Sequence, residues 1–375
     1  IKEAIKKTYG KKGEDVVKMN WEAVDRTNEA LEEIAVPSEL PKKHQKMKKL
    51  VPDDADEFTK NVIEKIMMEK GDDIPVSQMP LDGFVPTGTA KLEKRGVAPF
   101  VPHWIPEKCI QCNQCSFVCP HAAIRTKLID RDMLKNAPDT FKTIKAMGRD
   151  GEKYDYKVQV YTEDCQGCMV CVNECPKNAL VRSPIQEERD AGEIDNQKFF
   201  EELPYDVTSI VVKEASVKGS QFKQPLLEFS GACAGCGETP YVKLITQLYG
   251  DRMIIANATG CSSIWGGTFP TIPYTKNKDG HGPAWANSLF EDNAEYGFGF
   301  RLAVDANRRL LFASMEKALE NGVDGALRDA LTKAKELWKK TDEEAKANAR
   351  KIQELLPDAL KKASGETEKI LRKIK

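Results

Sequence analysis

The sequence predicts a multidomain protein that combines an α+β domain with an α/β domain. A cysteine pattern occurs twice between residues 109 and 176, and a short apolar run typical of a strand follows each copy. Further along, a helical pattern at residues 238–249 precedes a short apolar run at residues 253–258 that ends in small and polar residues, as in an α/β sheet. With 375 residues, the chain is long enough for two or three domains.

The repeated pattern has the form C-x2-C-x2-C-x3-C-P in both copies. This is the spacing of bacterial ferredoxins that carry two [4Fe–4S] clusters, in which the fourth cysteine of each run binds the other cluster. The sequence therefore predicts two crossed ligand sets: Cys109, Cys112, Cys115 and Cys175 for the first cluster, and Cys165, Cys168, Cys171 and Cys119 for the second.

Two other interpretations of these cysteines are weaker. Structural zinc usually takes two C-x2-C pairs, which leaves the third and fourth cysteines of each run unexplained. A disulfide framework is typical of short secreted domains, whereas this chain is long and starts without a secretory signal. The cysteines therefore indicate metal ligands in a reducing compartment, and we expect a cytoplasmic protein.

Composition limits the expected partners. The chain carries 57 basic and 58 acidic residues, a net charge of −1, so we expect neither nucleic acid nor a membrane surface as a partner. No apolar run approaches the ~18 residues of a membrane helix. Because the chain starts at Ile1 without an initiator Met, we expect it to be cut from a longer protein.

Proline-rich stretches and shifts in charge divide the chain into four expected segments. They are residues 1–50, the end of a preceding domain and a linker; residues 51–99, a loop-rich strap; residues 100–192, a dicluster ferredoxin-like domain; and residues 193–375, a partial α/β domain with a helical C-terminal part.

Helix is predicted over residues 1–35, with breaks near Gly10 and Gly13, and again over residues 56–70. The basic run at residues 42–49 is interpreted as a solvated face, and docking of an acidic electron-transfer partner is the alternative. We expect the strap to lie across other domains.

Within the cysteine-rich domain, strands are predicted over residues 124–129, 156–161 and 180–183. A helix is predicted over residues 130–147. The segment between the two cysteine runs is longer than a minimal dicluster ferredoxin requires, so we expect it to contact another domain.

The last segment is predicted to contain a strand over residues 207–212, a helix over 238–249 and a buried strand over 253–258. Residues 266–299 are rich in Gly, Pro and aromatic side chains, and we expect packing roles for Trp265 and Trp285. Residues 300–375 are predicted to form charged helices that act as a surface scaffold.

Three cysteines remain. Cys233 and Cys236 form a C-x2-C pair in a glycine-rich loop, and Cys261 follows the strand predicted at residues 253–258. A redox dithiol, a zinc site and a third iron–sulfur cluster all remain open. A redox dithiol would leave Cys261 without a role. A zinc site or a cluster would need a fourth ligand, and the chain contains no twelfth cysteine.

Long strings around these cysteines closely resemble pyruvate:ferredoxin oxidoreductases. The similarity runs in collinear order from residue 1 to about residue 305, with shorter matches at residues 9–13 and in the strap. The long strings are G-A-C-A-G-C-G-E-T-P-Y at 231–241, N-A-T-G-C-S-S-I-W-G-G at 257–267 and G-P-A-W-A-N-S-L-F-E-D at 282–292.

This resemblance implies oxidative decarboxylation of pyruvate on thiamine diphosphate and Mg²⁺, transfer of the acyl group to coenzyme A, and electron transfer through three clusters to ferredoxin or flavodoxin. By match to the family, Cys233, Cys236 and Cys261 resemble ligands of a proximal [4Fe–4S] cluster. Glu238, Thr259 and Cys261 resemble groups beside the thiamine, in a partial thiamine-diphosphate-binding domain. A homodimer in anaerobic metabolism, with the remaining domains of the same enzyme as partners, is also implied.

Parts of the family pattern are missing. The fourth proximal ligand and the Gly-Asp-Gly…Asn element for Mg²⁺ are absent, and K-D-G-H-G at residues 278–282 is interpreted as a turn, with His281 as a loop residue. No residue is therefore assigned as catalytic. The alternatives are a stand-alone electron-transfer module without catalysis and a related 2-oxo acid:ferredoxin oxidoreductase.

Overall fold

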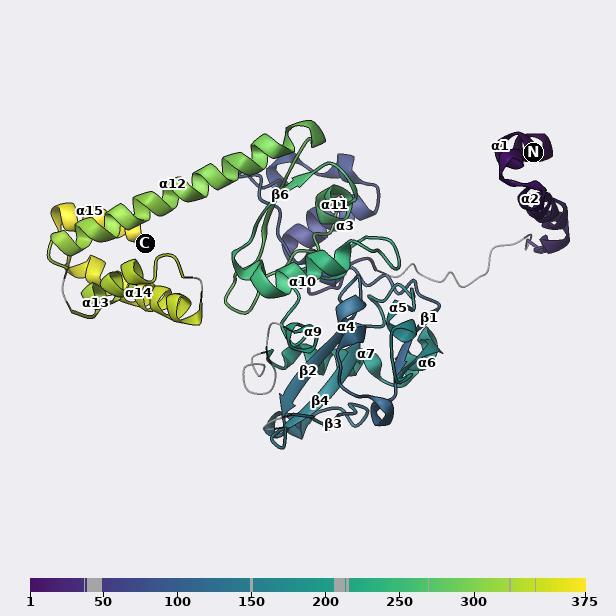
Figure 1. Ribbon diagram of the computed structural model, residues 1–375, viewed down its shortest axis with the longest axis horizontal. Coiled ribbons are helices and arrows are strands. Elements are labelled where there is room, and N and C mark those ends of the chain that lie inside the picture. Colours follow the sequence, from purple (N-terminus) through teal and green to yellow (C-terminus); the bar gives the residue numbers. More distant parts are fainter. Residues whose placement is uncertain are drawn as a thin grey trace. The chain divides into compact units, whose positions relative to one another are not determined.

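The computed structural model forms two compact units, residues 1–49 and residues 50–375, which are described separately (Figure 1). It describes residues 1–36, 38, 49–148, 151–205, 213, 216–268, 270–323, 325–340 and 342–375. The strand predicted at 207–212 and the basic run apart from Lys49 lie outside the described residues. Among those described, no helix is both long enough and apolar enough to cross a membrane.

The first unit consists of helices α1 (Lys2–Tyr9) and α2 (Glu14–Arg26). The predicted break is confirmed, because Gly13 takes a φ of 108° that strongly favours glycine. The predicted extension to residue 35 is wrong. A 3₁₀ turn (Thr27–Ala30) follows α2 and residues 31–36 are not helical. Two features disfavour helix here: the proline at position 37 disfavours the helical conformation at Val36, and Ile34 and Val36 are β-branched residues with lower helix propensity.

The second unit begins with the strap. The predicted helix is present as a π-helical turn (Thr59–Ile63) that continues into α3 (Glu64–Met67). Further on, the backbone N–H groups of Gly88 and Ala90 donate to residues 274 and 272, and that of Gly96 donates to residue 163. The strap thus lies across two separate parts of the unit, as expected.

The cysteine-rich part contains two small antiparallel sheets. Strand β1 (Phe100–Trp104) pairs with β5 (Leu180–Pro184), and β4 (Tyr154–Val160) lies between β2 (Ile124–Asp130) and β3 (Ile144–Lys145). Short helices α4 (Gln114–Val118) and α5 (Val170–Asn173) precede β2 and β5 in the chain. The three predicted strands are confirmed to within two residues, and β1 was not predicted.

The helix predicted over residues 130–147 is wrong. The Asp130 carboxylate accepts from the backbone N–H of Asp132 at 3.0 Å and begins a short 3₁₀ turn (Arg131–Asn136). Ala137 is extended because Pro138 follows it. The chain then forms β3, so this segment completes the sheet instead of packing on it as a helix.

The sheet of β2 and β4 is buried on both faces. One face carries Ile124, Tyr156 and Val158, which line the two cavities beside the cysteine loops. The opposite face carries Arg125, Lys127, Lys157 and Gln159, all nearly inaccessible to solvent. Helix α7 (Glu193–Glu202), which follows α6 (Ile185–Asp190), contributes partners to this second face.

The following part contains α9 (Val217–Ser220), α10 (Thr239–Tyr249), β6 (Ile254–Ala258), the short α11 (Cys261–Ser263) and β7 (Ala284–Ser288). The predicted helix and strand are confirmed, and β7 pairs parallel to β6. The expectation that β6 is buried is wrong: Ile254 is 51% exposed. In a two-stranded sheet each strand has only one neighbour, which leaves the outer side of β6 uncovered.

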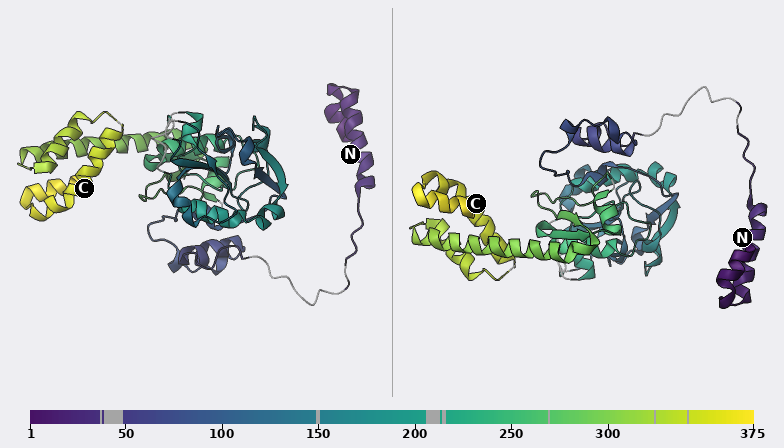
Figure 2. Two further views of the ribbon diagram at one scale, coloured as in Figure 1. Left: turned by 90° about the horizontal axis from the view of Figure 1, so that it is seen from below. Right: turned by 90° about the horizontal axis from the view of Figure 1, so that it is seen from above.

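The C-terminal part is helical, as predicted, with α12 as one continuous helix (Figure 2). Its elements are α12 (Asn293–Glu320), α13 (Gly325–Glu336), α14 (Glu343–Lys362) and α15 (Gly365–Ile374). They enclose an apolar core of their own, formed by Met315, Ala318, Leu327, Ala330, Leu331, Ile352, Leu356, Ile370 and Leu371.

Candidate metal centres

The eight motif cysteines line two small cavities. Each cavity is lined by three cysteines of one run and the last cysteine of the other run. The first group is Cys109, Cys112, Cys115 and Cys175, and the second group is Cys119, Cys165, Cys168 and Cys171. The structure thus brings together the same two crossed sets that the spacing predicts.

The two cysteine loops have the same backbone conformation, although their sequences differ. Left-handed residues occur two and four positions after the first cysteine of each run: Gln111 and Asn113 in the first loop, Gly167 and Met169 in the second. Such conformations cost about 1–3 kcal/mol for residues other than glycine, and they persist only where the surroundings enforce them. The repetition indicates that both loops wrap the same kind of object.

Hydrogen bonds hold the first loop in this strained form. The amide of Asn113 donates to the carbonyl of Lys218 at 2.8 Å and accepts from the Tyr156 hydroxyl at 2.8 Å. The amide of Gln111 donates to the Lys145 carbonyl and accepts from the Met147 N–H, both at 2.8 Å. The segment between the cysteine runs therefore supports the first loop directly.

Burial opposes ionisation of the thiols. It raises the pKa of Cys165 to about 12, and it raises those of Cys115 and Cys171 further. Neighbouring thiols of the same group add to each rise, since a second negative charge nearby is unfavourable. Bound cations would supply the missing positive charge, because metal binding displaces the thiol protons.

The geometry suits a cluster better than one ion. Among the residues that the structure describes, no three His, Cys, Asp or Glu side chains converge on a single point that could hold a metal ion. Tetrahedral zinc requires such convergence, with Zn–S distances of about 2.3 Å. A [4Fe–4S] cluster instead binds each thiolate through a different iron and occupies the space between the sulfurs, as the two cavities allow.

The Cys233–Cys236 loop lies against the second cysteine group. Gly235 has a φ of 75°, and a Cβ added there would lie 3.6 Å from the Cβ of Cys168. Cys236 is half-buried, whereas Cys233 and Cys261 are exposed. Like the eight motif cysteines, these three do not converge, in the described residues, on a point that could hold a single metal ion.

The residues matched to the thiamine site lie near the ends of secondary structure elements. Thr259 follows β6 and its hydroxyl donates to the carbonyl of Ser288, at the end of β7, at 3.3 Å. Cys261 begins α11, and Glu238 immediately precedes α10. Both strands thus place small polar groups at their carboxyl ends, as expected for an α/β sheet.

Several buried polar atoms in this region have no hydrogen-bond partner among the described residues. Among the described residues, the Thr239 hydroxyl, the Ser230 hydroxyl and the indole N–H groups of Trp265 and Trp285 are buried without a hydrogen-bond partner. Such groups are rare and costly in a complete fold. They fit a region that a bound group or a further part of a protein completes.

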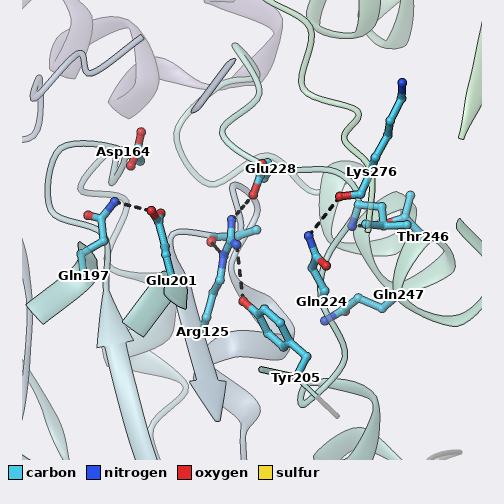
Figure 3. Close-up of polar contacts among 12 residues, drawn as sticks. Arg125, Asp164, Gln197, Glu201, Tyr205, Gln224, Glu228, Thr246, Gln247 and Lys276 are labelled. Carbon is cyan, nitrogen blue, oxygen red and sulfur yellow. Dashed lines mark hydrogen bonds and ion pairs between the residues drawn. The ribbon is translucent and has the colours of Figure 1, made fainter. Parts of the chain in front are cut away.

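Basic residues that the sequence did not reveal as functional connect residues 121–125 to the segment at residues 228–233. Nδ1 of His121 lies 3.1 Å from the Ser230 carbonyl oxygen, and Nε2 lies 3.1 Å from that of Cys233. The Arg125 guanidinium donates to Glu228 at 2.5 Å and to the Tyr205 hydroxyl at 3.5 Å (Figure 3). The only sequence signal for His121 was its place directly after Cys119 and Pro120.

The turn at residues 278–282 is confirmed. The side-chain oxygen of Asn277 accepts from the backbone N–H groups of Asp279 and His281, at 3.0 and 2.9 Å. Trp265 is buried and packs against Tyr274, with ring centroids 6.2 Å apart, which is the packing role expected for it.

Two family models match the chain. Residues 103–192 match a family described as a 4Fe-4S dicluster domain, and residues 44–98 match one described as a domain of unknown function, EKR. The first range spans both cysteine groups, whereas the second covers most of the strap.

Curated relatives match almost the whole chain. It is 50% identical over 376 residues to the pyruvate:ferredoxin oxidoreductase of Moorella thermoacetica, which covers 99% of this chain and 31% of that protein. It is 49% identical to the pyruvate-flavodoxin oxidoreductase of Nostoc sp., over 89% of this chain and 29% of that one. For the probable pyruvate-flavodoxin oxidoreductase of Escherichia coli, the values are 45%, 81% and 26%.

The chain spans about a third of the length of these relatives. The identity is high and extends through the strap, both cysteine groups and the Cys233–Cys236 loop. The chain is therefore a homologue of a segment of the pyruvate:ferredoxin and pyruvate-flavodoxin oxidoreductases, and it contains a 4Fe-4S dicluster domain.

Proposed function

We propose that this chain forms the electron-transfer part and a portion of the thiamine diphosphate site of a pyruvate:ferredoxin oxidoreductase. The complete enzyme converts pyruvate and coenzyme A to acetyl-CoA and CO₂ and passes the electrons to ferredoxin or flavodoxin. The observation that carries the proposal is the pair of matched cavities, each lined by four cysteines, with the Cys233–Cys236 loop against one of them. The names of the relatives supply the substrate and the electron acceptor.

The two cysteine groups would each hold one [4Fe–4S] cluster. When bound, such clusters accept and release single electrons at potentials set by charge, hydrogen bonds and solvent exposure. The chain's own contribution is to orient the thiolates and exclude water. Apolar side chains such as Ile124, Val158 and Leu180 line the cavities, and backbone N–H groups point at sulfur, as Ala179 does toward Cys175 at 3.2 Å.

Cys233, Cys236 and Cys261 would hold a third cluster, with a fourth ligand from elsewhere in the enzyme. Glu238, Thr259 and Cys261 would line the thiamine diphosphate, whose Mg²⁺-binding element would also come from elsewhere. The unpartnered polar atoms of Thr239, Trp265 and Trp285 support a site that is completed by additional groups. We place the domain limits at residues 50, 99 and 192, as the sequence suggests.

The proposal extends to the setting of the enzyme. Free cysteine ligands and reduced clusters require a reducing compartment, which favours the cytoplasm. A homodimer, with the remaining domains of the same enzyme as further partners, is proposed from the family resemblance alone.

One observation favours a second candidate function for this chain by itself. Each dicluster group has four cysteines in this chain, whereas the third group has three. Alone, the chain would therefore act as an electron-transfer module that an external reductant reduces and pyruvate does not.

Anaerobic iron and acid-labile sulfide analysis, with low-temperature EPR of the reduced chain, tests the proposal. We expect about eight irons per chain and two interacting [4Fe–4S] signals. About twelve irons would mean that the third group also binds a cluster in this chain and would favour the enzyme over the module. Stoichiometric zinc without labile sulfide would contradict both candidate functions.

A further inference from the structure

Lys243 makes an unusual contact between two domains. It lies on α10, 1% of its surface is exposed, and its ammonium reaches into the cysteine-rich domain. There it donates to the backbone carbonyl oxygens of Ser116, Phe117 and Cys119, the last two at 3.2 and 3.0 Å. These carbonyls belong to the C-terminal end of α4 and the residue that follows it.

The three carbonyl oxygens suit a protonated Lys243 side chain. An ammonium has three N–H donors and no acceptor, and here three carbonyl oxygens receive them. A neutral amine has only two N–H groups, so its lone pair would face a carbonyl oxygen. The C-terminal end of a helix also carries partial negative charge and carbonyls without helical partners, which favours a cation at this place.

The position of α4 places this charge between the two candidate clusters. Cys115, of the first group, lies within α4, and Cys119, of the second group, directly follows it. The ammonium of Lys243 contacts the carbonyl of Cys119 directly, whereas it reaches Cys115 only through the carbonyl of the adjacent Ser116. Arg125, which acts on Lys243, is paired with Glu228, so its charge is largely compensated, and Lys218 lies near Cys112 and Cys109 of the first group only.

We propose that Lys243 is a positioning residue through which the α/β domain sets the reduction potential of the iron–sulfur domain. This inference rests on the function proposed above. Reduction of a [4Fe–4S] cluster adds one electron, here from an external reductant, and makes the site more negative. A fixed buried cation stabilises that product, because screening is weak in the protein interior. Lys243 thus raises the potential of both clusters, and of the Cys119 group more.

Redox titration of the whole reconstituted chain, followed by EPR, tests this role. In K243Q, we expect the reduction equilibrium of the second cluster to become about tenfold less favourable, a fall of about 59 mV for one electron. The first cluster should shift in the same direction by less. K243R keeps the charge and should retain both midpoints near those of the unchanged protein.

K127Q is a matched control. Lys127 is also 1% exposed and donates to two backbone carbonyls, but these belong to Phe200 and Leu203, and the charges that act on it are those of Arg125 and Glu201. K127Q should destabilise the fold and leave both midpoints unchanged. Equal shifts in K127Q and K243Q would overturn the specific role of Lys243.

Other results would contradict either the role of Lys243 or the proposed function. K243Q with full iron content and unchanged midpoints would show that Lys243 only docks the domains. Loss of iron in both K243Q and K243M, with full content in K243R, would assign the charge to assembly and would overturn the tuning role. Absence of [4Fe–4S] signals in the unchanged protein would instead refute the proposed function itself.

Discussion

Arg125 and Glu228 form a buried ion pair that joins β2 to the segment before the Cys233–Cys236 loop. Both side chains are 7% exposed, and the guanidinium also stacks near the rings of Tyr161 and Phe229. A buried ion pair adds little to the free energy of unfolding compared with a pair of apolar side chains, but removing one partner leaves a buried charge unpaired, which is costly. The pair is therefore expected to matter more for the correct docking of the loop than for net stability.

Arg125→Met should therefore lower the apparent free energy of unfolding by about 3–5 kcal/mol. Denaturant unfolding of the reconstituted chain measures the effect. The double variant R125M/E228Q removes both charges and should recover a large part of the loss. A single variant no less stable than the double variant would show that the pair is not buried in solution.

Lys157 predicts a pH dependence of stability. Burial lowers its pKa to about 8, while Glu193 opposes the shift and Lys142 adds to it. Between pH 8 and the unfolded value of about 10.5, the unfolded state binds more protons, so this residue makes stability rise with pH. Below pH 8 both states are protonated and the cost of burying the charge is constant.

Comparison with Lys157→Met isolates this effect from other alkaline titrations. The stability of the unchanged protein relative to K157M should increase by no more than about 3 kcal/mol between pH 8 and 10.5. Thermal unfolding of both proteins across this range measures it. A stability difference that stays constant with pH would show that Lys157 titrates alike in the folded and unfolded states.

The cysteine loops are the elements that fix the candidate clusters, and Gly167 is the critical residue of the second loop. Its φ is 70°, and an added Cβ would lie 3.0 Å from the Phe100 carbonyl oxygen and 3.1 Å from the Cβ of Ala98. Both contacts involve atoms that are fixed by the β1 region. Alanine there would combine backbone strain with a close contact.

Gly167→Ala should therefore impair the second cluster and spare the first. Iron content should fall from about eight toward about four per chain, with one EPR signal retained. Gly299 lies within α12, has no left-handed φ, and a Cβ added there would meet no atom within 4 Å, so Gly299→Ala adds the same methyl group without strain and serves as control. Full assembly in both variants would contradict the strain argument.

At the scale of elements, sequence patterns predicted the features that depend on residues close together in the chain. Cysteine spacing predicted which cysteines line each of the two cavities, and apolar alternation predicted β2, β4 and β5. The helix expected over residues 130–147 failed because the Asp130 cap and Pro138 turned the chain into β3. The β-strand β1 was missed because its pairing with β5, about eighty residues later, leaves no local pattern.

For the whole molecule, the residues that join domains could not be predicted. Lys243 and His121 reach carbonyl oxygens more than one hundred positions away in the chain. In sequence, one is a lysine on an amphipathic helix and the other a histidine after a Cys-Pro step. Backbone carbonyls carry no side-chain signature, so such contacts appear only in three dimensions. The thiamine contacts came from resemblance alone and remain a proposal.

The arrangement of the three cysteine groups leads to a prediction for the complete enzyme. Cys236 belongs to the segment after residue 192, whereas the cysteines that line the two cavities all lie between residues 109 and 175. If the third group connects the thiamine site to the dicluster domain, its loss should separate two activities. Cys236→Ala should abolish reduction of the clusters by pyruvate, while dithionite should still reduce both of them.

Cys112→Ala should instead remove one dicluster signal. Loss of all signals in C236A would show that Cys236 supports the dicluster fold, and unchanged reduction by pyruvate would show that electrons reach the two clusters without the third group.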